Sequence, residues 1–252
     1  MPTLWTKILI NLKNIRGYAL DIFFPINCLG CGAEEGWICE TCSQKIKIRD
    51  QQLCPLCEKI ITPDGQVCFA CKHKSPLSGL LVAASYQEPL VSKAVHLFKY
   101  RFIEELSAPL TKIILKAIRS YELPLPDLIM PIPLHTKRLH WRGFNQSSLL
   151  AKNLAENLLP NSQLEVCEDI LIRSRHTLPQ MSLKDHQQRN RNIQNAFTIN
   201  DFSKIKDKRI LLVDDITTTG STIFECARVL KKAGAKEIYA TVIARQEYKK
   251  KS

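Results

Sequence analysis

Two adjacent carboxylates precede a short segment that is rich in hydroxyl groups. Asp214 and Asp215 follow the apolar run at 210–213, and the chain then reads Ile-Thr-Thr-Thr-Gly-Ser-Thr from 216 to 222. Hydroxyl groups and free N–H groups at the start of a helix bind anions, and a glycine lets the backbone approach a phosphate closely. The two carboxylates can accept hydrogen bonds from the hydroxyls of a ribose. The segment therefore predicts a ribose 5-phosphate site formed by Asp214, Asp215, Thr217, Thr218, Thr219, Gly220, Ser221 and Thr222.

A plainer interpretation of the same segment is a strand, a turn and a helix that is capped by a serine or threonine. That interpretation leaves two consecutive carboxylates at the mouth of the turn without a role. We therefore favour the phosphate site.

Arginines outside this segment can bind a second anionic group. The predicted loop at 135–146 holds Arg138 and Arg142 and contains no acidic residue. Their guanidinium groups can hold pyrophosphate oxygens in a forked geometry. Asn145 or Gln146 in the same stretch can instead cap the helix that follows. A second basic loop, for which a solvated flexible hairpin is one interpretation, holds Arg173, Arg175, His176, Lys184, His186, Arg189 and Arg191.

Eight of the ten cysteines form four C-x-x-C pairs near the N-terminus. Each pair points two sulfurs at one metal, and two pairs complete a tetrahedral four-sulfur site with Zn–S bonds of about 2.3 Å. Pairing in order along the chain is simplest, although interleaved pairing stays open, and an iron–sulfur cluster ranks below zinc. The expected ligands of two zinc ions are Cys28, Cys31, Cys39 and Cys42 in one site and Cys54, Cys57, Cys68 and Cys71 in the other.

The metal sites are expected to be structural, because a closed four-sulfur site has no open position for chemistry. A contact with nucleic acid or with a partner protein is the alternative, since lysines and arginines surround the thiolates. These basic residues are Lys45, Lys47, Arg49, Lys59, Lys72, His73 and Lys74.

The overall charge and composition limit the compartment and the partners. The 252 residues carry a net charge of +12, which favours anionic partners such as phosphorylated substrates, nucleic acid or anionic lipid; solubility alone is the plainer reason for such a charge. Clustered cysteines indicate metal binding in a reducing interior, and no apolar stretch approaches the roughly 18 residues of a transmembrane helix. The sequence therefore predicts a cytoplasmic protein.

Four segments are expected to position these groups. Residues 1–24 form an amphipathic helix, with the helical period over 3–24, which packs on the protein itself or lies as a basic helix on a membrane surface. Residues 25–76 form the Cys-rich module, and 248–252 form a basic tail. Within 77–247, strands at 79–86, 127–133, 208–214 and 237–244 alternate with helices at 104–120, 145–158 and 221–233. This alternation predicts an α/β domain whose mostly parallel sheet has helices on both faces.

The stretch 209–222 resembles the motif by which type I phosphoribosyltransferases bind 5-phosphoribosyl-1-pyrophosphate (PRPP). Over about residues 20–245, the chain resembles the ComF (competence protein F) family, whose members carry C-x-x-C pairs before a phosphoribosyltransferase-like domain. Further matching pieces are Phe98-Lys99-Tyr100, Pro131-Ile-Pro-Leu134, Arg138, Arg142-Gly-Phe-Asn-Gln146, Arg173, Thr177, Gln180, Leu183, Arg189, Arg191-Asn192 and Ala196-Phe197.

The resemblance implies a type I phosphoribosyltransferase fold, a double zinc ribbon, and PRPP bound with Mg²⁺. It implies that Lys99 occupies the pyrophosphate-loop position and that the basic loop near 173–191 closes over PRPP. It also implies a role in natural transformation, in which the protein handles incoming single-stranded DNA with other DNA-uptake proteins. Exposed aromatics such as Trp141 and Phe144 would suit a strand groove. An active phosphoribosyltransferase with an unidentified acceptor is the alternative, and an interaction module with a vestigial transferase fold is a third hypothesis.

Overall fold

The computed structural model describes residues 26–159, 164–177 and 186–246. The predicted helix at 3–24 and the tail at 248–252 lie outside these ranges. The chain divides into two compact units after Lys45. In the first unit, the described residues are the turns that carry the first four cysteines and the short helix α2 (Glu40–Lys45). The boundaries at residues 24, 76 and 247 stay predictions.

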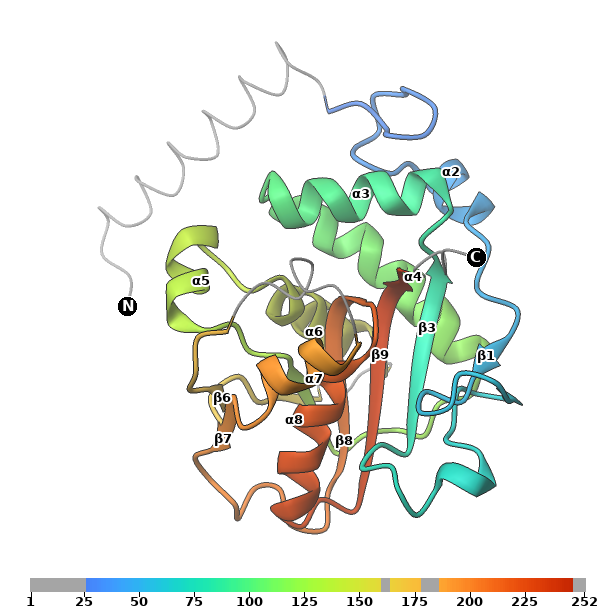
Figure 1. The fold of residues 1–252 in the computed structure, drawn as a ribbon. Coiled ribbons are helices and arrows are strands. Elements are labelled where there is room, and N and C mark those ends of the chain that lie inside the picture. The colour runs from blue at the N-terminus through green and yellow to red at the C-terminus, as the bar shows by residue number, and fades with distance from the viewer. Residues whose placement is uncertain (1–25, 160–163, 178–185, 247–252) are drawn as a thin grey trace. The chain divides into compact units, whose positions relative to one another are not determined.

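A parallel five-stranded sheet forms the centre of the second unit (Figure 1). Its order is β3 (Gly79–Ser85), β9 (Glu237–Arg245), β8 (Arg209–Thr217), β4 (Leu128–Pro131) and β5 (Glu165–Val166), and every neighbouring pair is parallel. Four of these strands coincide with the four predicted apolar runs. The prediction of a mostly parallel sheet is therefore confirmed.

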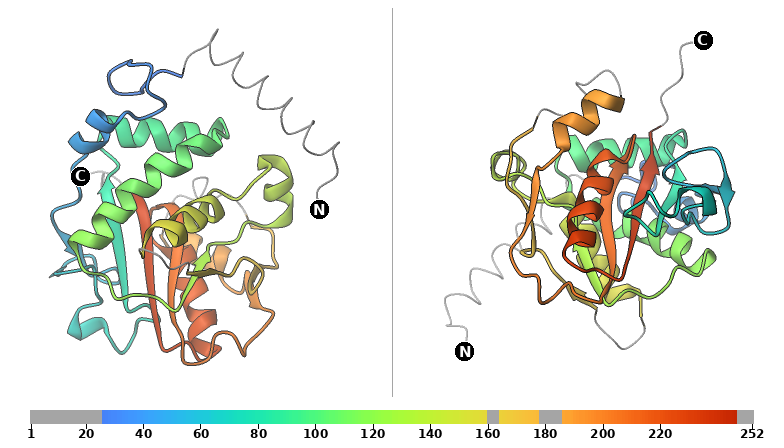
Figure 2. Two further views of the ribbon diagram at one scale, coloured as in Figure 1. Left: turned by 180° about the vertical axis from the view of Figure 1, so that it is seen from behind. Right: turned by 60° about the horizontal axis from the view of Figure 1, so that its bottom comes forward.

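Helices cover both faces of this sheet, as predicted (Figures 1 and 2). On one face lie α4 (Ser107–Ser120) and α6 (Gln146–Asn157), with α3 (Pro89–Tyr100) next to α4. On the other face lies α8 (Ser221–Lys232), which contacts α7 (His186–Ile193).

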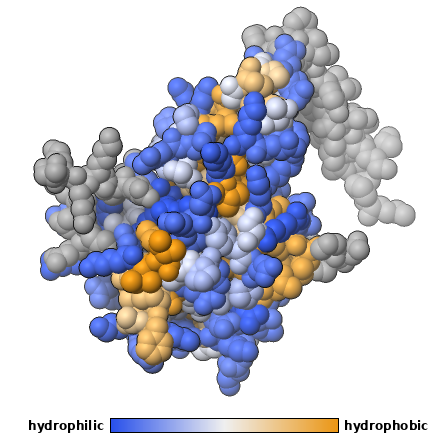
Figure 3. Space-filling view, turned by 90° about the vertical axis from the view of Figure 1, so that its right-hand side faces the viewer, coloured by the Kyte–Doolittle hydropathy of each residue, from blue (hydrophilic) through white to orange (hydrophobic). Residues whose placement is uncertain are grey.

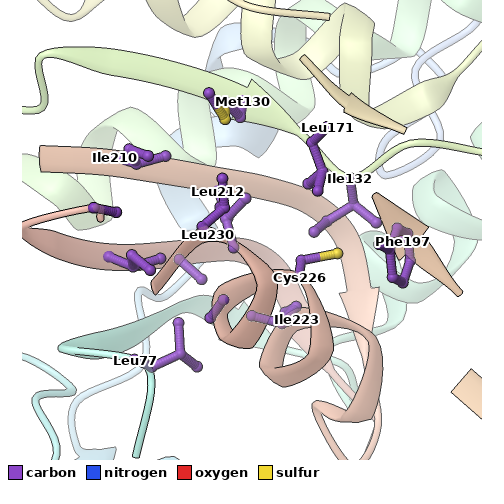
Figure 4. Close-up of a cluster of buried hydrophobic side chains, with 14 of the residues drawn as sticks. Leu77, Met130, Ile132, Leu171, Phe197, Ile210, Leu212, Ile223, Cys226 and Leu230 are labelled. Atoms are coloured by element: carbon purple, nitrogen blue, oxygen red, sulfur yellow. The ribbon is translucent and has the colours of Figure 1, made fainter. Parts of the chain in front are cut away.

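Each face of the sheet buries alternate residues of its strands, as the two-residue period of a strand requires. Ile210 and Leu212 of β8 belong to the core that α8 covers (Figure 4). Their neighbours Leu211 and Val213 are equally buried. With apolar side chains on both faces, β8 is fixed in register, and its carboxyl end is held in place.

The stretch 135–146 is not the plain loop that the sequence predicted. Residues Thr136–Arg142 form the helix α5, because the Nδ1 of His135 accepts a hydrogen bond from the N–H of Lys137 at 3.2 Å and Gly143 ends the helix with a φ of 82°. The second basic loop also contains regular structure. It includes α7 and the antiparallel pair β6 (Leu171–Arg173) and β7 (Phe197–Ile199).

The second cysteine cluster packs on the edge of the sheet within the same compact unit. Its small hairpin pairs β1 (Gln52–Leu53) with β2 (Ile61–Thr62), and a 3₁₀ turn, η1 (Phe69–Cys71), follows. The buried amide of Gln52 donates to the carbonyl of Val82 at 3.0 Å and accepts from its N–H at 3.1 Å. A Cβ at Gly65 would lie 2.3 Å from the carbonyl oxygen of Leu80, so only glycine fits there. The β1–β2 hairpin and the turn at Gly65 thus cover the edge strand β3. Together with η1 they carry the second cysteine cluster, and they are called the second zinc ribbon below.

Candidate functional site

The acidic pair lies near the carboxyl end of β8, next to the amino end of α8. Asp214 Oδ1 accepts hydrogen bonds from Ser147 Oγ and from the N–H of Asp215, both at 2.9 Å. Lys99 Nζ lies 3.1 Å from Asp215 Oδ1, and the side chain of Asp215 is only 7% exposed. Because α6 carries Ser147 and α3 carries Lys99, three elements fix the positions of the two carboxylates.

Electrostatics make the acidic pair a receptor for a cation. Burial, with the charge of Asp215 second, raises the pKa of Asp214 to about 7, although Lys99 and Ser147 oppose that shift. Burial lowers the pKa of Lys99, but the two carboxylates outweigh it and raise that pKa overall. Lys99 therefore stays charged, and Asp214 takes up a proton near neutral pH unless another cation approaches it.

The segment after the acidic pair forms the amino end of α8. Gly220 precedes the helix with a φ of 76°, a left-handed conformation, and a Cβ there would lie 3.2 Å from the ring of Phe224. Thr219 Oγ1 lies 2.7 Å from Ser221 Oγ, and the N–H of Ser221 donates to Thr219 Oγ1 at 3.4 Å. Hydroxyls and helix-start amides therefore converge at one point, which is the arrangement that binds a phosphate.

A cavity of about 620 Å³ brings the predicted groups together. All eleven residues predicted to bind PRPP line it, and they come from five segments of the second unit. They are Lys99, Arg138, Arg142, Asp214, Asp215, Thr217, Thr218, Thr219, Gly220, Ser221 and Thr222.

The arginines at the cavity have free donor capacity. Arg142 Nη1 donates to Gln146 Oε1 at 3.0 Å, whereas its buried Nε has no hydrogen-bond partner; Arg138 Nη2 donates to the carbonyl of Thr177 at 3.0 Å. Arg173 also lines the cavity, and its buried Nε is likewise unpartnered. Within the described ranges, no carboxylate pairs with Arg138, Arg142 or Arg173. Arg173 is buried and the other two arginines are half-buried, and cations without a carboxylate partner in such surroundings suit an anionic ligand.

Burial lowers the pKa of two of these arginines. Burial, followed by the neighbouring Arg138, lowers the pKa of Arg173 to about 10. Burial and Arg142 lower the pKa of Arg138. The smaller part of each shift comes from a neighbouring positive charge, and an anion bound between the arginines would relieve that repulsion.

Other residues of the second basic loop lie outside the cavity lining. Arg189 Nη1 donates to Thr218 Oγ1 at 3.2 Å, so it fixes the position of one hydroxyl of the segment that precedes α8. Arg175 Nη2 donates to the carbonyls of Asn192 and Gln194 at 2.9 and 2.6 Å, beyond the lining residues. Lys184, together with Gln180 and Leu183, lies outside the described residues, and so does the side chain of His186.

Aromatic side chains form one rim of the cavity. Trp141 is 67% exposed and Tyr100 is 39% exposed, and both line the cavity. Phe102 packs edge-on against Trp141 with ring centroids 5.4 Å apart. Phe144 was expected to be exposed, but it is half-buried against Phe98 and Phe102, because it anchors the end of α5. Of the two aromatics that were expected to be exposed, Trp141 is thus the one that remains open to a ligand.

The sequence interpretation assigned no role to Ser147 and did not include Arg173 among the binding residues. Asn145 caps α6 by accepting from the N–H of Ser147 at 3.2 Å, as one prediction had it. The polar run Asn-Gln-Ser-Ser at 145–148 was a signal that this helix begins near the carboxyl end of the sheet. It did not reveal that Ser147 would meet Asp214.

The cysteines converge in two sets of four. In each set, the sulfurs lie within 4.8 Å of one another, and the sets follow the order of the chain: Cys28, Cys31, Cys39 and Cys42, then Cys54, Cys57, Cys68 and Cys71. Interleaved pairing is therefore wrong.

Both sets fit zinc. Zn–S bonds of about 2.3 Å in a tetrahedron place the sulfurs about 3.8 Å apart. The Sγ atoms of Cys31 and Cys39 are 3.6 Å apart, and those of Cys57 and Cys68 are 3.9 Å apart. The N–H of Cys39 also donates to Cys28 Sγ at 3.3 Å, which stabilises a thiolate.

The described parts of the chain contain no helix that is both long and apolar enough to cross a membrane.

Comparisons with known proteins agree with this architecture. The phosphoribosyl transferase domain family matches residues 145–252, and the double zinc ribbon domain family matches residues 19–72. The DNA utilization protein YhgH of Salmonella typhi is 35% identical over 215 residues, which cover 82% of this chain and 90% of that protein. A purine phosphoribosyltransferase from Pyrococcus horikoshii is 19% identical and covers 54% of this chain and 80% of its own, but its TM-score of 0.29 adds no support for the fold.

Competence protein F of Haemophilus influenzae is 31% identical over 239 residues, which cover 88% of this chain and 98% of that protein. Identity at this level over nearly both full lengths establishes common descent. With its two cysteine clusters and its phosphoribosyltransferase-type domain, the chain belongs to the ComF family.

Proposed function

We propose that the cavity binds PRPP together with Mg²⁺. The observation that carries this proposal is the convergence of an acidic pair, a hydroxyl-rich helix start and several cations around one cavity. The 5-phosphate would meet the amides and hydroxyls of Thr217–Thr222, and the ribose hydroxyls would donate to Asp214 and Asp215. The pyrophosphate would meet Lys99, Arg138 and Arg142, whose donors include a buried unpartnered Nε.

Mg²⁺ fits this donor set. Such sites use few protein ligands and many substrate oxygens. Among the residues that line the cavity, Asp214 and Asp215 supply the carboxylate oxygens that such an ion prefers. The bound ion would neutralise part of the pyrophosphate charge. On the protein side, a cation near the pair would favour the ionised form of Asp214, whose pKa lies near 7.

Calorimetric titration of zinc-loaded protein with PRPP and Mg²⁺ tests this proposal. Asp214→Ala combined with Asp215→Ala removes two charge-assisted contacts and is expected to weaken binding at least about 100-fold. Asp201→Ala is the matched control, because Asp201 bonds to Ser203 and lies outside the cavity lining. Equal affinity of the wild type and the double variant would sink the proposal.

We further propose that the protein handles incoming single-stranded DNA in natural transformation, in the cytoplasm. The related proteins carry the names competence protein F and DNA utilization protein. Trp141 and Tyr100 present aromatic surface at the rim of a cavity that also holds one lysine and three arginines, which suits bases and phosphates of a single strand. The net charge of +12 would favour the same partner.

Anisotropy of a labelled 20-nucleotide strand at several salt concentrations tests strand binding. Trp141→Ala is expected to weaken binding roughly 5- to 150-fold, the range for losing one stacked base, while Phe202→Ala, which removes an exposed aromatic outside the cavity lining, is expected to leave it unchanged. An abasic strand of equal length should bind wild type and Trp141→Ala alike. Binding without salt dependence, or no binding near physiological salt, contradicts the proposal.

The second zinc ribbon supports a contact with other DNA-uptake proteins. Its Ile60, Ile61 and Phe69 are exposed, and Figure 3 shows apolar side chains gathered on the face that carries this ribbon. Exposed apolar patches mark interaction sites. Phe69→Asp is expected to lower transformation frequency while the zinc content and PRPP affinity stay unchanged. Unchanged transformation would exclude this surface.

An active phosphoribosyltransferase is the second candidate. The cavity continues from the charged groups to the aromatic rim, so an acceptor would have a place beside the ribose. The bond between the anomeric carbon and the pyrophosphate oxygen would break, and a nitrogen of the acceptor would form the new bond and lose its proton to solvent. Pyrophosphate release that requires a nitrogenous acceptor supports this function; no release with any base or oligonucleotide counts against it.

A further inference from the structure

We infer that Glu58 and Arg245 connect the second zinc ribbon to the phosphate-binding segment, residues 217–222. Through this connection they position the amide donors of that segment for the ligand. Both are positioning residues, since neither is placed against the ligand itself. This inference rests on the proposed PRPP site and adds to it a dependence on the zinc ribbon.

Arg245 donates a hydrogen bond to the backbone of the phosphate-binding segment. Arg245 is the last residue of β9, and its Nε donates to the carbonyl of Thr218 at 2.9 Å. The next residue acts in the same way, because the N–H of Gln246 donates to the carbonyl of Thr217 at 2.9 Å. Two consecutive carbonyls of the segment are therefore fixed by the end of β9.

Fixing a carbonyl also fixes the amide of the next residue. In a planar trans peptide, the C=O of one residue and the N–H of the following residue point in opposite directions. The N–H groups of Thr218 and Thr219 therefore point away from the β9 side. Neither N–H has a hydrogen-bond partner in the part of the chain that the structure describes, and both residues line the cavity. These are the donors that a phosphate would use.

Glu58 holds Arg245 in turn. Arg245 Nη2 forms an ion pair with Glu58 Oε1, and the arginine side chain is only 10% exposed. A second cavity of about 190 Å³ lies beside this pair and is lined by Glu58, Arg49 and Arg245. Without the carboxylate, the guanidinium would have both room to turn and no partner to keep its Nε aimed at Thr218.

Glu58 belongs to the metal-binding turn of the second cluster. It follows Cys57 directly, its N–H donates to the carbonyl of Cys54 at 2.9 Å, and its φ is 55°. Four thiolates on one ion would fix the shape of this turn, and the turn fixes where the carboxylate lies. Since Glu58 is 46% exposed, the ion pair adds little to stability. The ion pair instead sets a position: when zinc occupies the ribbon, Glu58 holds the guanidinium of Arg245 so that its Nε can donate to the carbonyl of Thr218.

Calorimetry with PRPP and Mg²⁺ on zinc-loaded variants tests the inference. Glu58→Ala, which removes the acceptor oxygens, and Arg245→Lys are each expected to raise the Kd about tenfold, the order for one charge-assisted hydrogen bond. A lysine has a single nitrogen and does not reach both partners. The double variant should bind no more weakly than the weaker single variant, because both changes break one connection. Glu105→Ala, at an exposed position of the same unit, is the matched control.

A second measurement distinguishes positioning from general weakening. At a fixed free zinc concentration in a metal buffer, PRPP should raise the zinc occupancy of the wild type, since linkage is reciprocal, and Glu58→Ala should abolish that rise. Glu58→Ala and Arg245→Lys with the Kd and the zinc response of the wild type would overturn the inference while the PRPP site stands. Wild-type protein that binds no PRPP would overturn both. If Arg245→Lys does not fold, the Glu58→Ala result decides alone.

Discussion

The ionised carboxylate of Asp214 is expected to destabilise the ligand-free protein, and Asp214→Asn should reveal this. The pKa of Asp214 rises from an ordinary value of 3.8 to about 7 in the folded protein. A carboxyl whose pKa is raised by folding contributes full stability below its unfolded pKa and loses it as the pH rises through the folded pKa. Asparagine does not titrate, and its Oδ1 can still accept from Ser147 and from the N–H of Asp215.

The magnitude follows from the two pKa values. Between them, the free energy of unfolding falls by about 1.4 kcal/mol per pH unit relative to the uncharged variant. From pH 5 to pH 7 the advantage of Asp214→Asn therefore grows by about 2 kcal/mol, and by pH 8 it has nearly levelled off. Relaxation of the site around the charge makes that figure an upper bound, so a growth of about 1–2 kcal/mol is expected.

Urea unfolding of zinc-saturated protein at pH 5 and pH 8, without PRPP or Mg²⁺, measures this effect. The difference between variant and wild type at each pH removes the pH dependence of zinc binding, which both share. Asp201→Asn is the control with the opposite sign, because bonds from the Ser203 hydroxyl and backbone lower the pKa of Asp201. Its difference from the wild type should be the same at both pH values. An Asp214→Asn difference that is equally flat would refute the reasoning.

Three further changes test the metal site, the phosphate-binding segment and the core. Cys54→Ser with Cys57→Ser should reduce bound zinc from two ions to one per chain by elemental analysis, and two retained ions would contradict the ligand assignment. Gly220→Ala, at a φ of 76°, should cost about 1 kcal/mol of stability in urea unfolding and weaken PRPP binding in calorimetry; an unchanged Kd would remove Gly220 from the site. Phe98→Ala should cost about 3–5 kcal/mol in the same assay, since its side chain is fully buried, and a loss no larger than that of the exposed Phe202→Ala would argue against the core packing.

The central strands could be predicted from sequence because each is a short apolar run that is buried on both faces. The cysteine sets could be predicted because each C-x-x-C turn brings its own two ligands together. The helix α3 was missed although Val91, Ala94, Val95 and Phe98 have the helical period and Pro89 marks its first turn. That signal was present in the sequence.

The contacts that complete the site depend on packing between distant segments. Ser147 and Asp214 are 67 positions apart, and Arg245 and Glu58 are 187 apart. No local pattern encodes such a pair, since it depends on α6 packing on β8 and on the second ribbon covering the edge of the sheet. For the same reason, the sequence showed two similar cysteine sets but did not reveal that the second set shares a compact unit with the cavity.

The most direct test of the central claim, that the cavity is a PRPP–Mg²⁺ site, is a calorimetric titration of the zinc-loaded wild type. PRPP with Mg²⁺ should bind with one molecule per chain. Ribose 5-phosphate and pyrophosphate should each compete but bind more weakly, because each reaches only part of the cavity. Removing Mg²⁺ should weaken PRPP binding. Folded protein that shows no saturable binding of PRPP with Mg²⁺ at millimolar concentration would contradict the claim.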